Sequence, residues 1–257
     1  MKIFPVVHID ANNNLEAAKR DSNRAFELGA DGIYLINRRG SKYDTKAIFE
    51  TFNSILDESA DRYVGLNILG LSPLGAMRAL ARALENKGRL TSTPSGLLID
   101  DMCDDLPKKS AMEFKNSHPK LKQVRLVGGI AVKGTKTDEN VDNPDVALYR
   151  TVYLEDSVDV VMTRGAEPGQ PPTVEKLYAM KKFMGNKPLA VMGGISAENI
   201  DRYKGIVDEV LVSARVETGS YYGDFDTNKL KELIEKARDL AESNTNKETP
   251  DLAFLCL

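Results

Sequence analysis

Short apolar runs rich in β-branched residues alternate with longer amphipathic stretches along the chain. Several runs are almost entirely apolar, which is typical of strands buried on both faces of a parallel sheet. The eight candidate strands are Lys2–His8, Gly32–Ile36, Tyr63–Leu69, Gly96–Ile99, Gln123–Val127, Asp159–Met162, Leu189–Met192 and Glu209–Val212. The intervening helical patterns cover Leu15–Leu28, Thr45–Ser59, Pro73–Asn86, Lys108–Asn116, Asp145–Leu154, Val174–Phe183, Ala197–Tyr203 and Thr227–Glu242.

Eight βα units in unbroken succession predict a closed (β/α)8 TIM barrel, an α/β fold. A doubly wound sheet normally has five or six strands, and no Gly-x-Gly-x-x-Gly follows the first strand. We expect one barrel domain over residues 1–243 and a separate segment over 244–257. That segment is a polar linker followed by a short apolar C-terminal tail, which we expect to dock on its own barrel or on a neighbouring subunit.

Composition narrows the function classes. The 257 residues carry a net charge of −3 and form no dense basic run, so a nucleic-acid partner is not expected. No apolar run is long enough to insert into a membrane, and no secretory signal precedes the first strand, which favours a cytoplasmic protein. The two cysteines, Cys103 and Cys256, make neither a disulfide framework nor a zinc motif. We expect no required cofactor, and a homo-oligomer remains open.

The strongest functional pattern lies at the ends of the seventh and eighth strands. There Gly193 and Gly194 precede a serine-initiated turn, and Ser213-Ala214-Arg215 follows the next strand. Glycines let backbone N–H groups approach an anion, and these two loops are where TIM barrels commonly bind phosphate. Ordinary tight turns are the alternative. The predicted phosphate-binding residues are Gly165, Gly193, Gly194, Ser213, Ala214 and Arg215.

Three longer motifs support that interpretation. They are Asp-Val-Val-Met-Thr-Arg-Gly-Ala-Glu-Pro-Gly-Gln-Pro-Pro-Thr from residue 159, Pro-Leu-Ala-Val-Met-Gly-Gly-Ile-Ser-Ala-Glu-Asn-Ile from 188, and Val-Asp-Glu-Val-Leu-Val-Ser-Ala from 207. From residue 159 to about 234, the chain resembles the BtpA/SgcQ family of the ribulose-phosphate-binding barrels. The resemblance implies a barrel fold and a phosphate ligand. It does not fix a reaction, because related barrels are isomerases, epimerases, lyases and synthases, and this family is implicated in photosystem I biogenesis.

Arg215 departs from the pattern, because related barrels usually have a small residue at this position. Its guanidinium could contact phosphate, fill the site, or turn outward to solvent.

Acid–base candidates stand at other strand ends. His8 ends the first strand and Asp10 follows it, so the imidazole could act as a general base with a carboxylate to orient it. The alternative is a histidine that only covers the barrel core.

The fourth strand is followed by four carboxylates, beginning with Asp100 and Asp101. Such a cluster repels itself unless cations neutralise it, so Mg²⁺ held by Asp100 and Asp101 is one interpretation. A solvated acidic turn that caps the next helix is the other. Arg125 inside the fifth strand needs a buried acidic partner, and Asp100 is a candidate.

Further polar residues complete the expected ring around the barrel mouth. Lys133 is a candidate for Schiff-base chemistry if it is buried, or for an ion pair with a carboxylate or phosphate. The remaining ring residues are Asn37, Arg38, Asn67 and Thr163.

Three functions follow from these residues. The first is an isomerase, epimerase or lyase that acts on a sugar phosphate or phosphoribosyl compound. Proton transfer by His8 or Asp100 would be aided by Lys133 or Arg38, which stabilise negative charge, and the predicted catalytic residues are His8, Asp10, Asn67, Asp100 and Lys133. The second is a non-catalytic assembly or regulatory barrel that still binds phosphate. The third, suggested by the glycine-rich end of the fifth strand, is nucleobase chemistry of the tRNA-guanine-transglycosylase type. A catalytic barrel should bring His8, Asp100 and Lys133 into one cavity with perturbed pKa values, whereas an assembly factor should expose a large apolar patch.

Overall fold

The computed structural model describes residues 1–9, 15–37, 45–58, 61–86, 88–102, 110–132, 140–167, 169–219 and 224–245. Asp10, Arg38, Lys133 and the apolar C-terminal tail therefore lie outside the described residues.

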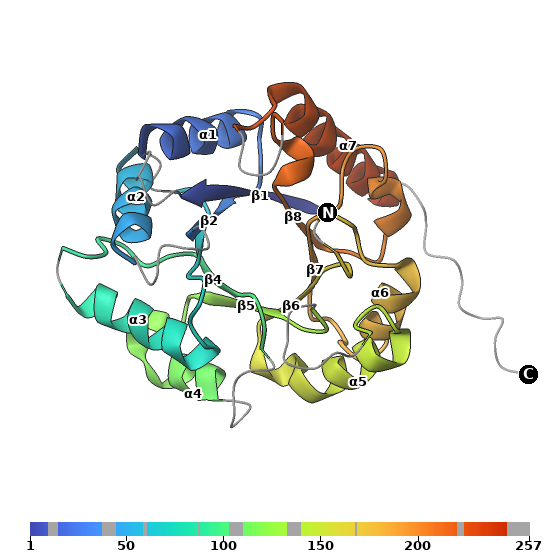
Figure 1. Cartoon of the computed structure of the whole chain (residues 1–257), viewed down its shortest axis with the longest axis horizontal. Coiled ribbons are helices and arrows are strands. Elements are labelled where there is room, and N and C mark those ends of the chain that lie inside the picture. Colours follow the sequence, from blue (N-terminus) through green and yellow to red (C-terminus); the bar gives the residue numbers. More distant parts are fainter. Residues whose placement is uncertain are drawn as a thin grey trace, which may run out of the picture.

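Eight parallel strands close into a barrel in the sequential order β1 to β8, and a ring of helices surrounds it (Figure 1). This confirms the predicted TIM-barrel fold. The strands are β1 (Lys2–Ile9), β2 (Ile33–Asn37), β3 (Val64–Asn67), β4 (Gly96–Ile99), β5 (Arg125–Gly129), β6 (Val160–Thr163), β7 (Leu189–Met192) and β8 (Glu209–Val212). The helices are α1 (Leu15–Glu27), α2 (Thr45–Glu58), α3 (Pro73–Glu85), α4 (Ser110–Ser117), α5 (Pro144–Leu154), α6 (Val174–Lys181) and α7 (Thr227–Thr245).

Local capping explains where several helices begin. Ser72 accepts a hydrogen bond from the Gly75 N–H and is followed by a proline, so it caps α3 as the sequence predicts. Asn143 caps α5 in the same way, one residue before Pro144. Among the described helices, none is long and apolar enough to cross a membrane.

The helix predicted after β7 is wrong. That segment forms turns and a short 3-10 helix, η3 (Ile200–Tyr203), in place of an α-helix. The Asn199 side chain accepts from the Ser196 N–H and donates to the Gly194 carbonyl. These side-chain bonds offer the backbone an alternative to helical hydrogen bonds.

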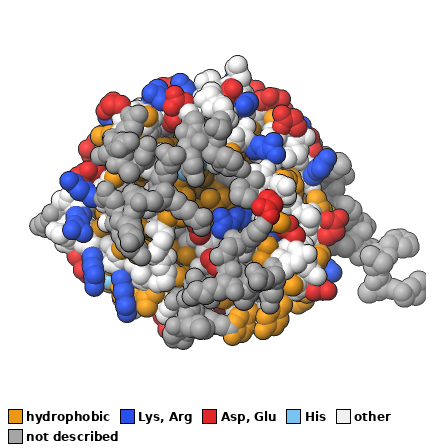
Figure 2. Space-filling view, in the orientation of Figure 1, with side chains coloured by type: hydrophobic (Ala, Val, Ile, Leu, Met, Phe, Trp, Pro, Cys, Tyr) orange, Lys and Arg blue, Asp and Glu red, His pale blue; other side chains and the backbone are white. Residues whose placement is uncertain are grey.

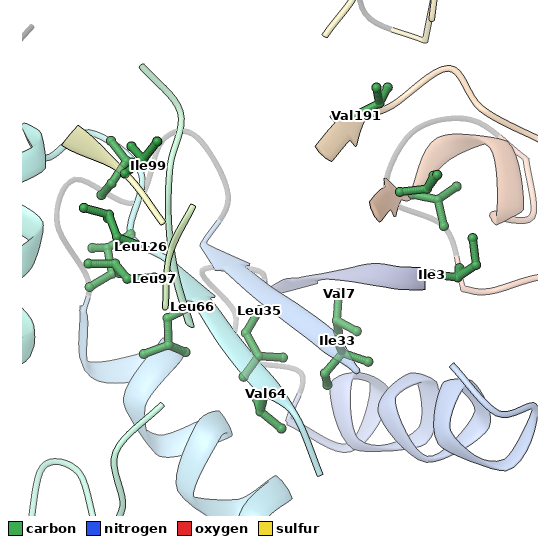
Figure 3. Close-up of a cluster of buried hydrophobic side chains, with 14 of the residues drawn as sticks. Ile3, Val7, Ile33, Leu35, Val64, Leu66, Leu97, Ile99, Leu126 and Val191 are labelled. Atoms are coloured by element: carbon green, nitrogen blue, oxygen red, sulfur yellow. The ribbon is translucent and has the colours of Figure 1, made fainter. Parts of the chain in front are cut away.

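Strand alternation divides the core into two layers. Ile33 and Leu35 of β2 point outward and pack in the large cluster between the strands and the helices, beside Val64 and Leu66 of β3 (Figure 3). The alternate residues, such as Tyr34, point into the barrel and form a separate inner cluster. This parity decides which polar residues at the strand ends face the barrel axis.

The N-terminal end of the barrel is filled by aromatic side chains and one ion pair. The rings of Phe4, Tyr34 and Tyr63 contact one another, and the two tyrosine hydroxyls lie 2.7 Å apart. Arg125 bonds Glu209 of β8 at 2.6 Å. The expectation that Arg125 pairs with Asp100 is therefore wrong.

The strand register explains this result. Arg125 is level with Gly96 at the start of β4, whereas Asp100 follows the end of that strand. The two side chains consequently belong to opposite ends of the barrel, about 13 Å apart along the strands.

Candidate functional site

The carboxyl ends of the strands bring several of the predicted polar residues to one mouth. By strand parity His8 follows Phe4 and Val6 on the inward face of β1, and Ser213 follows Leu211 on the inward face of β8. Hydrophobic, acidic and basic side chains lie near the centre of the face shown in Figure 2. We call the end of the barrel at the carboxyl ends of the strands, where the active sites of TIM barrels lie, the C-terminal mouth.

His8 has a buried carboxylate beside it. Its Nδ1 lies 3.5 Å from Oε1 of Glu217, whose side chain is 2% exposed, while the His8 side chain is 19% exposed. Glu217 follows the short 3-10 helix η4 (Ala214–Val216) after β8. A bridge to Phe225 and a hydrogen bond from Lys229 Nζ to the Glu217 carbonyl hold its backbone.

Sequence reasoning missed Glu217, because it named Asp10 as the partner of His8. The sequence indicates Glu217 only weakly, as a single acidic residue four positions after Ser213 and next to Val216. Only closure of the barrel between β8 and β1 shows that this acid returns to the first strand.

Asn67 and Asp100 form a second pair at the mouth. The Asn67 amide donates to Oδ1 of Asp100 at 2.9 Å, and Asn67 is buried. The backbone at Asp100 runs close to Gly129, where an added Cβ would meet the Asp100 carbonyl oxygen at 1.8 Å. The glycine at the end of β5 thus allows this approach. In the part of the chain that the structure describes, no group of three or more histidine, cysteine or acidic side chains could hold a metal ion, and Asp101 belongs to none.

Asn37 and Thr163 end strands but share the outward parity of Leu35 and Val161. Asn37 accepts from the Leu69 N–H at 2.7 Å, and Thr163 donates to the Ala131 carbonyl at 3.2 Å. Both are buried and connect neighbouring strand ends, so they position loops and do not face the barrel axis.

The glycines of the predicted anion loops have different surroundings. Gly193 and Gly194 both have positive φ, of 81° and 76°. The Gly193 N–H donates to the Leu211 carbonyl, while the space beside its Cα is open. Gly194 and Gly165 instead lie against the backbone of residues 170–171, with no room for a Cβ. The segment after β6 therefore packs on the turn after β7.

Arg215 is exposed and bridges two loops. Its guanidinium donates to the Gly169 carbonyl at 3.0 Å, which connects the segment after β8 to the segment after β6. A cavity of about 200 Å³ lies beside it. The lining residues are Ser196, Ala197, Glu198, Ala214, Arg215, Val216, Lys229 and Glu232. A hydrogen bond from Ser196 lowers the pKa of Glu198, with smaller contributions from Arg215 and Lys229.

A fully buried lysine organises the neighbouring part of the mouth. Lys176 Nζ donates to the carbonyls of Ala131 and Arg164 at 2.9 and 2.8 Å, and to Asp142 at 3.2 Å. Burial lowers the pKa of Lys176, an effect that Asp142 opposes. Ala131, with φ of 52°, is the one non-glycine residue with positive φ among the described residues. Its carbonyl accepts from both Lys176 and Thr163, which holds this strained residue in place.

No protein-family model matches the chain, and no curated protein sequence matches it. Many solved structures share its fold. Phosphoribosyl anthranilate isomerase from Thermus thermophilus is 16% identical with a TM-score of 0.58, and the match covers 93% of this chain and 100% of that one. A tryptophan synthase alpha-subunit from Pyrococcus furiosus is 16% identical with a TM-score of 0.62, over 91% and 98% of the two chains.

A third match is (S)-3-O-geranylgeranylglyceryl phosphate synthase from Thermoplasma acidophilum, solved with its substrate sn-glycerol-1-phosphate. It is 16% identical with a TM-score of 0.56, over 93% of this chain and 94% of that one. At such identities these likenesses establish the barrel fold alone.

Proposed function

We propose that this protein is a cytoplasmic enzyme that acts on a small phosphorylated substrate by acid–base chemistry at the C-terminal mouth. The substrate class is a sugar phosphate or a phosphoribosyl compound. The pairing of His8 with the buried carboxylate of Glu217 is the observation that carries the proposal. A mouth histidine with a carboxylate at one ring nitrogen is suited to move a proton with the other.

In the proposed reaction Glu217 orients the imidazole through Nδ1, so that Nε2 of His8 exchanges a proton with substrate. Asp100, held by the Asn67 amide, supplies a second proton-transfer group on the other side of the mouth. Lys133 and Arg38 would stabilise negative charge that develops on the substrate. This set of groups favours isomerase, epimerase or lyase chemistry over hydrolysis.

The phosphate would bind at the ends of β7 and β8, beside Gly193 and Gly194 and against the half-buried Ser213 and Ala214. Open space beside Gly193 and its positive φ support this placement. Two of the structural matches support the substrate class by name, since one is a phosphoribosyl compound isomerase and another holds sn-glycerol-1-phosphate.

The test has two parts. Inorganic phosphate and ribose 5-phosphate are titrated into ¹⁵N-labelled protein, and the Gly194 and Ala214 amide signals are expected to shift. A panel of sugar phosphates is then incubated in D₂O, and deuterium incorporation is followed by mass spectrometry in wild type and His8→Gln. No amide shift at these loops would contradict the anion site, and exchange that survives His8→Gln would contradict the role of His8.

A second candidate is a non-catalytic, BtpA-like assembly or regulatory barrel that binds phosphate. The observation that favours it is a group of exposed aromatic side chains on α5 and α6. Phosphate binding without deuterium exchange for any member of the panel would favour this candidate.

A further inference from the structure

Large exposed hydrophobic side chains gather on one side of the barrel. Among the described residues, the large hydrophobic side chains that are at least 50% exposed all come from α5, α6 and the turn after α6. They are Tyr149, Val152, Tyr153, Tyr178 and Phe183, with exposures from 50% to 70%, and we call them the tyrosine patch. In Figure 2 hydrophobic side chains crowd the lower edge of the molecule, where Figure 1 places α5.

The residues of the patch are organised on the two helices and are not isolated exposed side chains. Tyr149, Val152 and Tyr153 share one helical face by their i, i+3 and i+4 spacing. The rings of Tyr149 and Tyr153 are stacked, with centroids 6.1 Å apart and planes 11° apart. α5 and α6 pack side by side, and their opposite faces already bury Ala147 and Leu177 against the barrel. In the single chain the tyrosine patch thus leaves half or more of each of its side chains uncovered.

We infer that the tyrosine patch is the interface of a two-fold symmetric dimer of this chain. Aromatic side chains bury roughly 150–250 Å² each when fully covered, so the four aromatic residues of the patch, each half or more exposed, offer on the order of 400 Å². A stable interface buries about 800 Å² per partner, of which the apolar centre is a part and a polar rim the rest. The patch thus matches the centre of a standard-sized interface.

The charges around the patch fit pairing with itself. Asp145 and Asp156 are exposed at the two ends of the α5 segment, and Lys182 is exposed just after α6. A two-fold interface uses the same surface of both copies, so a contact between Asp145 of one copy and Lys182 of the other forms twice, once on each side of the axis. Three of the five patch residues are tyrosines, the type enriched at interfaces between soluble proteins.

Dimerisation would also act on the mouth. α5 begins two residues after Asp142, and α6 contains Lys176, the two side chains that hold the strand ends of β5 and β6. A partner bound to the outer faces of both helices would limit their movement and so hold Asp142 and Lys176 in position. The inference does not depend on the proposed catalytic function.

The experiment is sedimentation velocity on the full chain over a range of micromolar concentrations. Wild type is expected to be a dimer. Tyr153→Lys is expected to raise the dimer dissociation constant at least about tenfold, because it places a charge in the apolar centre. Asn116→Lys, on the exposed face of α4, adds the same charge elsewhere and should leave the dimer intact. Circular dichroism checks that each variant folds.

A chain lacking residues 251–257 tests the apolar C-terminal tail as the alternative occupant. A truncated chain that still dimerises through Tyr153 supports the inference. A monomeric full chain overturns it, and so does a Tyr153→Lys variant that dimerises like wild type. Dimerisation that appears only on truncation would show that the tail covers the patch, and dimerisation lost only on truncation would assign the interface to the tail. Both results overturn the inference.

Discussion

Nδ1 of His8 lies 3.5 Å from the buried carboxylate of Glu217, although the two residues stand near opposite ends of the chain. His8 belongs to the first strand, and Glu217 follows the last one. Closure of the barrel between β8 and β1 brings them together. A carboxylate beside Nδ1 favours the proton on that nitrogen and leaves Nε2 as the acceptor.

This arrangement makes a spectroscopic prediction. Glu217→Leu removes the acceptor at Nδ1 but keeps an apolar side chain of similar size beside Val216 and Phe225. We expect the ¹⁵N signals of the neutral His8 ring to change from one tautomer in wild type toward a mixture in the variant. His118, whose Nε2 lies 3.1 Å from Glu85, is the one other histidine and should be unaffected. Unchanged His8 signals would show that Glu217 does not set the tautomer.

The fold was predictable because it depends on local patterns. Each strand and helix carries its own periodicity, and eight consecutive βα units leave few topologies other than a closed barrel. The position of His8, Asn67 and Asp100 at the same end of the barrel follows from strand ends in the same way, and Asn67 and Asp100 are bonded there. The outward direction of Asn37 and Thr163 was readable too, since parity with Leu35 and Val161 fixes it.

The partners of charged side chains were not predictable from local patterns. Arg125 bonds Glu209 across the barrel, and Glu217 and Lys176 reach the mouth from segments that the strand-end rule does not select. Such contacts depend on the relative height of strands and on how loops return over the mouth. A single sequence gives neither the relative height of the strands nor the path of the loops over the mouth.

Two adjacent glycines predict a contrast in stability. Both have positive φ, so alanine at either position costs about 1–2 kcal/mol for the left-handed backbone. Nothing lies near a Cβ on Gly193, whereas a Cβ on Gly194 would meet the Pro171 nitrogen at 2.1 Å. Gly194→Ala should therefore lower the free energy of unfolding by several kcal/mol more than Gly193→Ala, as measured by urea denaturation. Equal losses would mean that residues 170–171 do not pack on Gly194.

The ion pair at the N-terminal end predicts strong non-additivity. Arg125→Met leaves the Glu209 carboxylate, 3% exposed, without its cation and should cost about 3–5 kcal/mol of stability. The double variant Arg125→Met/Glu209→Leu removes both charges and should recover most of that loss. A double-mutant cycle by urea denaturation measures the coupling. Additive losses in the cycle would contradict a direct, buried interaction.

Lys176 predicts a large stability loss at the mouth. Lys176→Met keeps the apolar volume but removes the donors to Ala131, Arg164 and Asp142, so the free energy of unfolding should fall by about 3 kcal/mol. Lys231→Met, an exposed lysine on α7 whose side chain is 58% exposed, is the matched control and should cost well under 1 kcal/mol. A similar small loss in both variants would rule out a structural role for Lys176.

The same lysine predicts how stability depends on pH. Burial lowers its pKa below the ordinary value of 10.5, although Asp142 opposes this. Between the folded and the unfolded pKa the unfolded chain binds more protons, so stability rises with pH across that window, up to about 10.5. At pH values below the folded pKa, Lys176 is charged in both states, and burial of its charge lowers the stability by the full amount. Because Lys176→Met lacks this titration, the stability of wild type relative to the variant should increase from neutral pH to about pH 10. Urea denaturation of both proteins at each pH measures the difference, and a constant difference would contradict a lowered pKa.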